Sequence, residues 1–265
     1  MGAIGRKRRR GVGSIWAGGV RIRGADIARP HHRYPDRPVT VGSIPMPGLD
    51  WVDGYEHRRT VYVGIDIGQK RDPTAIAVVE SGPVEAADGS DGRMVVFVVR
   101  HLERLNLGTT YPDVAARVVE VLTGVKGHGA SIQRVYVDAT GVGQPVVDLL
   151  DRVGAANYGQ LVPVYFTHGD RRARGDSSPW PVTLGKAWLV SRLQVLLQDQ
   201  RLMFPATLPE REALVRELLD YEIRIGEDAN DRYGAFRVGA HDDMVTAVGL
   251  ACQEEVRYID GPLVV

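Results

Sequence analysis

The pattern of apolar and polar residues changes along the chain near residue 59. Before that point no period of two or of 3.6 residues persists, and Gly, Pro and Arg are frequent. Beyond it, short runs rich in β-branched residues alternate with segments whose apolar residues recur at helical spacing. Such runs predict buried strands, and such spacing predicts amphipathic helices. We therefore predict an arm or linker over residues 1–58, with short strands near 39–44, and a compact domain over residues 59–265.

The predicted elements of the compact domain follow a definite order. Three strands joined as hairpins come first, then strands that alternate with helices, then further helices and one additional β-hairpin. The strands are predicted at residues 61–67, 74–80, 94–102, 132–137 and 162–166, the helices at 111–122, 145–153, 183–200, 209–219 and 241–256, and the hairpin at 221–225 with 235–238. The polar, basic segment 169–181 is predicted as a surface loop. This order predicts an α/β fold with a mixed five-stranded sheet, antiparallel in its first three strands and parallel afterwards, flanked by helices.

Composition limits the class of protein. With 265 residues, 44% of them hydrophobic and 25% charged, the chain resembles an ordinary globular protein. Its single cysteine, Cys252, excludes an internal disulfide and a Cys-rich zinc site, as is common in a reducing cytoplasm. No apolar run approaches the roughly 20 residues that cross a bilayer, and the basic N-terminus lacks the apolar segment of a signal peptide. We expect a cytoplasmic protein that does not associate with a membrane.

The net charge of zero conceals an uneven distribution. Residues 1–60 contain twelve Lys or Arg against five acids, so the remainder of the chain is acidic. A basic arm favours a polyanionic partner, and an acidic body favours cation binding. For the Arg6–Arg10 run, a solvated tail without a partner is the alternative.

Four acidic residues, at three places in the sequence, stand out by their surroundings. Asp66 lies in an apolar strand, Asp138 ends another, and Asp242 and Asp243 open the last helix. A buried carboxylate is costly unless a cation accompanies it, and ligands of α/β sheets bind at strand ends. Converging carboxylates would suit Mg²⁺ or Mn²⁺, which prefer oxygen ligands, and two such ions can promote phosphodiester hydrolysis.

Each acid also has a purely structural interpretation. Asp66 could cap a turn, and Asp138 could cap the next helix or organise the turn at Gly141. Asp242 suits the N-cap of the last helix, and the helix dipole alone would favour Asp243 in its first turn. The acids are therefore informative as a set.

The chain from about residue 61 to residue 255 resembles the nuclease domain of phage large terminase subunits. The similar segments are Val-Gly-Ile-Asp-Ile-Gly ending at Gly68, Asp-Pro-Thr-Ala-Ile-Ala-Val at 72–78, Val-Asp-Ala-Thr-Gly-Val-Gly at 137–143, Lys186 before a long helix, Arg-Leu-Met-Phe-Pro at 201–205, Glu-Leu-Leu-Asp-Tyr at 217–221 and His-Asp-Asp-Met-Val-Thr-Ala at 241–247. The resemblance implies a ribonuclease H-like fold and an endonuclease that cuts concatemeric double-stranded viral DNA in the host cytoplasm.

By motif match, the resemblance places Asp66, Asp138 and Asp243 at the catalytic, metal-ligating positions, with Asp242 as a further candidate ligand. It implies two Mg²⁺ or Mn²⁺ ions. The family often has another acid one helical turn after Asp243, where this chain has Thr246. His241 could orient a ligand or a water molecule.

A complete large terminase also has an ATPase with a Gly-rich phosphate loop, and no such motif occurs in this sequence. We expect no ATPase activity from the chain and an ATPase supplied either by another polypeptide or by a missing N-terminal part. The small terminase subunit and the portal are the other expected partners.

Four basic residues are candidates for DNA contact: Lys186, Arg171, Arg172 and Arg174. For each, a solvated side chain is the alternative. Two other functions remain open. Asp66-Ile67-Gly68 weakly matches a phosphate loop of actin/hexokinase-type phosphotransferases, and a degenerate nuclease could serve as a catalytically inactive packaging adaptor. Binding of Mn²⁺ without nucleotide would favour the nuclease.

Overall fold

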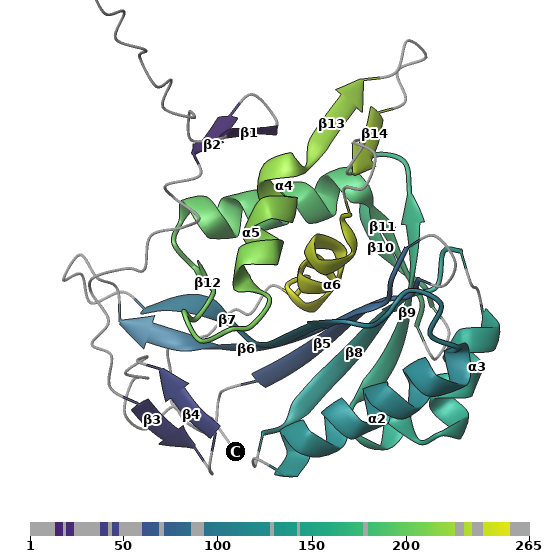
Figure 1. Cartoon of the computed structure of the whole chain (residues 1–265). Helices are drawn as coiled ribbons and strands as arrows, with labels where there is room; N and C mark the ends of the chain where they lie inside the picture. The colour runs from purple at the N-terminus through teal and green to yellow at the C-terminus, as the bar shows by residue number, and fades with distance from the viewer. Residues whose placement is uncertain are drawn as a thin grey trace, which may run out of the picture.

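A mixed sheet of eight strands lies at the centre of the structure (Figure 1). The structure is a computed structural model that describes residues 60–68, 72–85, 93–127, 130–141, 144–176, 180–225, 231–234 and 241–254, together with four short strands between residues 14 and 47. The strand order is β10-β11-β9-β8-β5-β6-β7-β12. These strands are β5 (Thr60–Asp66), β6 (Ala75–Glu85), β7 (Arg93–Arg104), β8 (Ile132–Asp138), β9 (Gln160–Thr167), β10 (Arg172–Arg174), β11 (Val182–Gly185) and β12 (Leu202–Met203).

The pairing of the strands confirms the predicted fold class. Strands β5, β6 and β7 form an antiparallel meander. On its other side β5 pairs in parallel with β8, which pairs in parallel with β9. The sheet extends beyond the five predicted strands, because β11 and β10 are added at one edge and β12 at the other.

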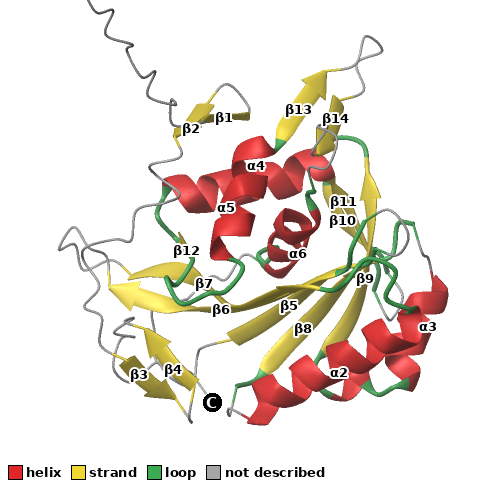
Figure 2. Cartoon of the chain, viewed as in Figure 1, coloured by secondary structure: helices red, strands yellow, loops and turns green. Residues whose placement is uncertain are grey.

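Helices cover both faces of the sheet (Figure 2). Helices α2 (Tyr111–Gly127) and α3 (Gln144–Arg152) pack on one face, while α4 (Lys186–Gln198), α5 (Arg211–Asp220) and α6 (Asp243–Ala251) pack on the other. Successive strand residues point to opposite faces. Accordingly Val61, Val63 and Ile65 pack under α2 and α3, whereas Tyr62 belongs to the core on the α6 face. None of the helices in the described ranges is long and apolar enough to cross a membrane.

Several predicted boundaries differ from the structure: the helices predicted at 111–122 and 241–256 are α2 (Tyr111–Gly127) and α6 (Asp243–Ala251). The segment predicted as a surface loop contains β10, and the helix predicted from residue 183 begins only at Lys186, after β11. The alternate residues Val182 and Leu184 are buried against β9, so they follow a strand period that the helical pattern concealed. An additional hairpin is present as β13 (Glu222–Ile225) and β14 (Asp231–Gly234). Its second strand lies within the segment predicted to connect the two strands, and residues 235–238 lie outside the described residues.

Within the predicted arm, four short strands form two hairpins separate from the central sheet. They are β1 (Ser14–Ala17) with β2 (Val20–Arg23), and β3 (Pro38–Val41) with β4 (Ile44–Pro47). The second hairpin corresponds to the strands predicted near residues 39–44. The division into an arm and a nuclease domain stays a prediction.

Candidate functional site

Two acidic side chains end adjacent parallel strands. Asp66 is the last residue of β5 and Asp138 the last of β8, and the residues before them, Ile65 and Val137, are register partners. Neighbouring strands lie about 4.8 Å apart, so the two strands end side by side. Ile65 and Val137 pack on the α2 face, and alternation therefore directs Asp66 and Asp138 to the α6 face.

Helix α6 contributes two further carboxylates from its N-terminus. Asp242 precedes the helix and Asp243 is its first residue. The helix lies directly on β5, because a Cβ added at Gly64 would come within 2.0 Å of the backbone oxygen of Ala247. The Asp243 side chain is buried, with 2% of its surface exposed. A glycine two residues before Asp66 thus permits the close approach of the helix that carries Asp243.

The electrostatics of these residues indicate that they share one location. Burial raises the pKa of Asp66 well above its ordinary value, and the negative charges of Asp138, Asp242 and Asp243 raise it further, while Lys186 opposes the shift. Burial also raises the pKa of Asp138 and of Asp242, again against the charge of Lys186. Such effects require short separations. We refer to Asp66, Asp138, Asp242 and Asp243 as the acidic cluster.

Asp243 is held by an ion-pair network that the sequence did not predict. Arg104, the last residue of β7, donates from Nε to Asp243 Oδ2 at 2.5 Å, and its Nη2 contacts Glu217 Oε1. Glu217 comes from α5 and is itself buried. The other oxygen of Asp243, Oδ1, is buried and accepts no hydrogen bond from the described part of the chain.

The N-terminus of α6 is capped by Glu217. Its Oε2 accepts hydrogen bonds from the backbone N–H groups of Met244 at 3.1 Å and Val245 at 3.2 Å. Asp242 occupies the N-cap position but makes no capping hydrogen bond. Because a neighbouring helix satisfies these amides, the Asp242 carboxylate is available to the acidic cluster, and the structural role considered for Asp242 is filled by another residue.

Asp138 combines two features. Its Oδ1 accepts a hydrogen bond from the backbone N–H of Thr140 at 2.8 Å, so it does organise the turn before Gly141. The Thr140 hydroxyl in turn accepts a hydrogen bond from the backbone N–H of Phe166, which ties this turn to the end of β9. These contacts fix the position of Asp138 at the carboxyl end of β8.

Lys186 and His241 lie beside the acidic cluster. Lys186 Nζ is 4.0 Å from Asp242 Oδ2 and 5.5 Å from the centre of the Phe166 ring. His241 Nδ1 is 3.8 Å from Asp243 Oδ1. Asp72 was assigned no functional role from the sequence, yet its charge contributes to the raised pKa of Asp242. In the sequence, the only indication of a role for Asp72 is its place at the start of the Asp-Pro-Thr segment that resembles the terminase nucleases.

The three arginines of segment 169–181 have different surroundings. Arg171 is exposed, and Arg174 lies over the ring of Trp180 at 4.6 Å. Arg172 instead turns toward the body of the domain, where its Nη2 is 3.0 Å from Glu254 Oε1. The structure therefore does not bring the three guanidinium groups together.

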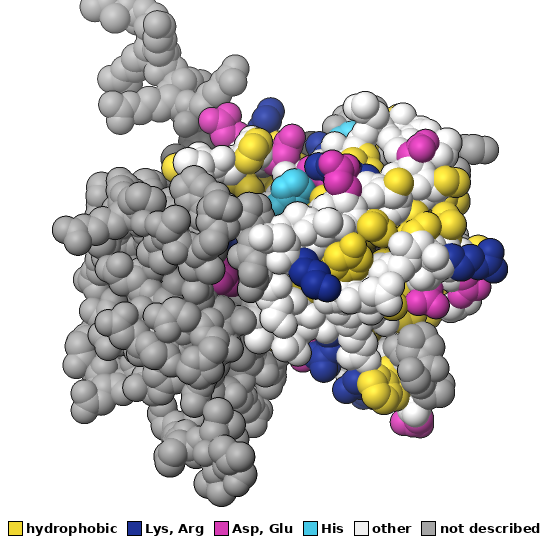
Figure 3. Space-filling view, turned by 90° about the horizontal axis from the view of Figure 1, so that it is seen from below, with side chains coloured by type: hydrophobic (Ala, Val, Ile, Leu, Met, Phe, Trp, Pro, Cys, Tyr) yellow, Lys and Arg dark blue, Asp and Glu magenta, His cyan; other side chains and the backbone are white. Residues whose placement is uncertain are grey.

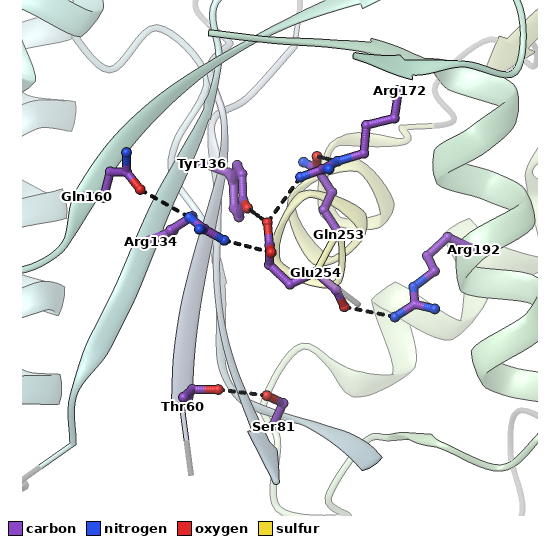
Figure 4. Close-up of polar contacts among 9 residues, drawn as sticks. All are labelled: Thr60, Ser81, Arg134, Tyr136, Gln160, Arg172, Arg192, Gln253 and Glu254. Atoms are coloured by element: carbon purple, nitrogen blue, oxygen red, sulfur yellow. Dashed lines mark hydrogen bonds and ion pairs between the residues drawn. The ribbon is translucent and has the colours of Figure 1, made fainter. Parts of the chain in front are cut away.

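The residues just after α6 are anchored by a second polar network (Figure 4). Glu254 accepts a hydrogen bond from the Tyr136 hydroxyl and forms ion pairs with Arg134 and Arg172. Burial alone would raise the pKa of Glu254, but Tyr136 and the two arginines outweigh it and the pKa is lowered. Arg192 of α4 donates to the backbone oxygen of Glu254. With Glu217 at its start, α6 is thus fixed at both ends.

The donor atoms of the acidic cluster suit a divalent cation. All are carboxylate oxygens, which Mg²⁺ and Mn²⁺ prefer, and the buried Oδ1 of Asp243 has no hydrogen-bond partner among the described residues. Within the described ranges, however, no three or more His, Cys, Asp or Glu side chains are already grouped as they would be around an ion. Arg104 and Lys186 instead contact two of the carboxylates, those of Asp243 and Asp242.

Comparison with known proteins bears on the fold. No family model and no curated protein matches the chain. Among solved structures, the large terminase nuclease of thermophilic phage G20c aligns with a TM-score of 0.50 and 24% identity, covering 77% of this chain and 88% of that one. Its magnesium-bound form gives 0.49 and 22%, covering 78% and 85%. The human cytomegalovirus terminase nuclease domain gives 0.46 and 17%, covering 72% and 81%.

The fold is thus ribonuclease H-like, with an antiparallel three-stranded meander, parallel strands and helices on both faces. More particularly, it is the fold of the nuclease domain of large terminase subunits.

Proposed function

We propose that this chain is a Mg²⁺- or Mn²⁺-dependent endonuclease that cuts concatemeric double-stranded viral DNA during genome packaging. The observation that carries the proposal is the convergence of Asp66, Asp138 and Asp243 near the carboxyl ends of β5 and β8. The fold is shared with the large terminase nuclease of phage G20c. The convergence depends on tertiary structure, because the three residues are far apart in the sequence.

In this proposal Asp66, Asp138 and Asp243 hold the metal, and Asp242 is an additional ligand. Two bound ions would activate a water molecule and stabilise the leaving oxygen of the phosphodiester. The chain's own contribution is to hold the carboxylates close together and oriented, and the charge of Lys186 partly offsets their raised pKa values. Lys186 lies within 4.0 Å of Asp242 and favours the charged form of the cluster. His241, beside Asp243, is placed to orient a carboxylate or a water molecule.

DNA would approach the carboxyl ends of the central strands β5 and β8. Lys186, Arg171 and Arg174 are the proposed phosphate contacts, with Arg172 as a weaker candidate because it pairs with Glu254. Seen from below, as in Figure 3, the described surface intersperses basic, acidic and hydrophobic side chains without a continuous basic patch. We therefore place the DNA at the carboxyl ends of β5 and β8 rather than on that face, with the basic arm as an additional contact.

A nuclease of this kind would act within a packaging complex. We propose a terminase ATPase, a small terminase subunit and the portal as its partners, in the host cytoplasm.

The test is cleavage of supercoiled plasmid by the full chain with Mn²⁺ or Mg²⁺. We expect nicking and degradation by the wild-type protein, and no cleavage by Asp66→Asn or Asp138→Asn, because each loses a charged ligand. Asp151→Asn is the matched control, since Asp151 is an exposed aspartate on α3, on the opposite face of the sheet. Full activity in both cluster variants would refute the assignment of ligands.

The inactive packaging adaptor is the second candidate. It is favoured by the absence of a ready-made metal-binding group among the described residues and by the pairing of Asp243 with Arg104. Calorimetric titration with Mn²⁺ separates the two, because an adaptor would bind neither metal nor nucleotide and the nuclease would bind metal alone. A phosphotransferase would require ATP, and nothing in the described structure favours it.

A further inference from the structure

Arg104 lies in line with the acidic cluster through the strand register. Asp66 of β5 pairs with Ala75 of β6, and Ala75 pairs with Arg104 of β7. Two strand spacings of about 4.8 Å separate Asp66 from Arg104 along this row. A shift in the β6–β7 register places Leu102, and with it Arg104, on the α6 face. The guanidinium group can therefore reach Asp243 from within the sheet.

The contacts of Arg104 fix one oxygen of Asp243 and leave the other free of this network. Nε donates to Oδ2, and Nη2 contacts Glu217, whose other oxygen caps α6. Arg104 thus restrains the Asp243 carboxylate through Oδ2, while Glu217 holds both Arg104 and the backbone at the start of α6. Oδ1 of Asp243 remains buried without a hydrogen bond from the described residues, in a side chain that is 2% exposed. His241 Nδ1 lies 3.8 Å from Oδ1, too far for a hydrogen bond. A buried oxygen without a hydrogen bond is costly unless a cation lies beside it.

We infer that Arg104 is a positioning residue for the metal site: held by Glu217, it orients Asp243 so that Oδ1 is presented to the divalent ion. This inference rests on the proposed function. It assigns Arg104 and Glu217 a role in metal binding although neither would touch the ion. Hydrogen-bond partners of metal ligands typically change metal affinity by about 10–100-fold when they are replaced.

Competition with the ion and simple cross-linking are the alternative roles for Arg104, and they predict different results. If Arg104 only competes with the ion for Asp243, removing its charge should tighten metal binding. If Arg104 only joins β7, α5 and α6, its loss should lower the unfolding temperature and leave the metal affinity of the folded protein unchanged. Orientation of Asp243 instead predicts weaker metal binding when the charge is kept but the geometry is lost.

The experiment measures Mn²⁺ affinity by calorimetry on the full chain with Arg104→Lys and Arg104→Gln, and unfolding temperatures in EDTA. Lysine keeps the charge without the planar, two-point contact. We expect the dissociation constant to rise by about 10-fold for Lys and toward 100-fold for Gln. Arg117→Lys and Arg117→Gln are matched controls. Arg117, in α2, pairs with Glu103, which precedes Arg104 in β7 and faces the opposite side of the sheet. These two variants should bind Mn²⁺ as the wild type does.

The outcomes are distinguishable. An unchanged or smaller dissociation constant in both Arg104 variants overturns the inference while leaving the proposed nuclease intact. If Arg104→Gln does not fold, Arg104→Lys decides alone, and wild-type affinity in that variant overturns the inference. Failure of the wild-type protein to bind Mn²⁺ overturns the proposed function and the inference together.

Discussion

Replacing Gly64 by alanine should disturb the site without altering any acidic residue. The added Cβ would lie 2.0 Å from the backbone oxygen of Ala247, 2.8 Å from the nitrogen of Ala251 and 3.0 Å from Cβ of Leu250. These atoms belong to the body of α6, so no flexible side chain can yield. To restore an ordinary contact of 3.4 Å with Ala247, helix and strand must separate by about 1.4 Å. The substitution therefore displaces the helix that carries Asp242 and Asp243.

The expected loss of stability follows from this overpacking. Such insertions cost about 1–3 kcal/mol of unfolding free energy, which for a domain of this size lowers Tm by roughly 2–12 °C. The expected loss of activity is larger in proportion, because a displacement of about 1 Å at a reacting centre can reduce the rate on the order of 100-fold. Thermal unfolding and the rate of plasmid nicking in Mn²⁺ measure the two effects separately.

Gly124→Ala is the matched control. Gly124 lies in α2 on the opposite face, and a Cβ there meets no atom within 4 Å. Alanine in a helix interior should stabilise the protein by about 0.5–1 kcal/mol and leave nicking unchanged. The reasoning is refuted if Gly64→Ala matches the wild type in Tm and in rate. A lower Tm with full activity would show that α6 does not position Asp243.

Two further predictions concern charge. The pKa of Asp66 is raised in the folded state, so the folded protein binds this proton more tightly than the unfolded chain, and stability should fall as pH rises above the ordinary aspartate range. Asp66→Asn should therefore raise Tm in EDTA at pH 8 by more than at pH 5; an equal or smaller effect at pH 8 would contradict the repulsion. Deleting residues 1–58 should weaken DNA binding and flatten its dependence on NaCl in anisotropy titrations, whereas an unchanged slope would mean that the arm does not contact DNA.

The central part of the fold and the principal acids could be predicted because their signals are local. An acid at the end of an apolar strand is unusual in sequence alone, and both Asp66 and Asp138 have this setting. Parallel pairing of β5 with β8 then brings them together. The preference for Asp243 over Asp242 rests on the family resemblance. The pairing of Asp243 with Arg104, and the lack of a capping hydrogen bond from Asp242, are visible only in the tertiary structure.

Arg104 was missed because a register shift conceals its orientation. Val95, Phe97 and Val99 alternate onto the α6 face, and simple alternation would continue through residues 101 and 103. The irregularity after Val99 moves Leu102 to that face instead, and Arg104 follows it. A bulge of this kind reverses the facing of every later residue in the strand, and it cannot be located from the sequence of one strand.

Glu217 did leave a signal in the sequence. Leu214, Leu218 and Tyr221 recur at the spacing of a buried helical stripe, and Glu217 falls within that stripe. A charged residue at such a position indicates a buried partner. Its partners, Arg104 and the amides at the start of α6, lie on elements distant in sequence, and only the packed structure identifies them.

The most direct test of the proposed metal site is a crystal structure of the full chain soaked in Mn²⁺, read by anomalous scattering. We predict manganese between the carboxylates of Asp66, Asp138 and Asp243, with Oδ1 of Asp243 as a ligand and Oδ2 still bonded to Arg104. Side chains of these three aspartates directed to separate places, with no ion between them, would contradict the proposal.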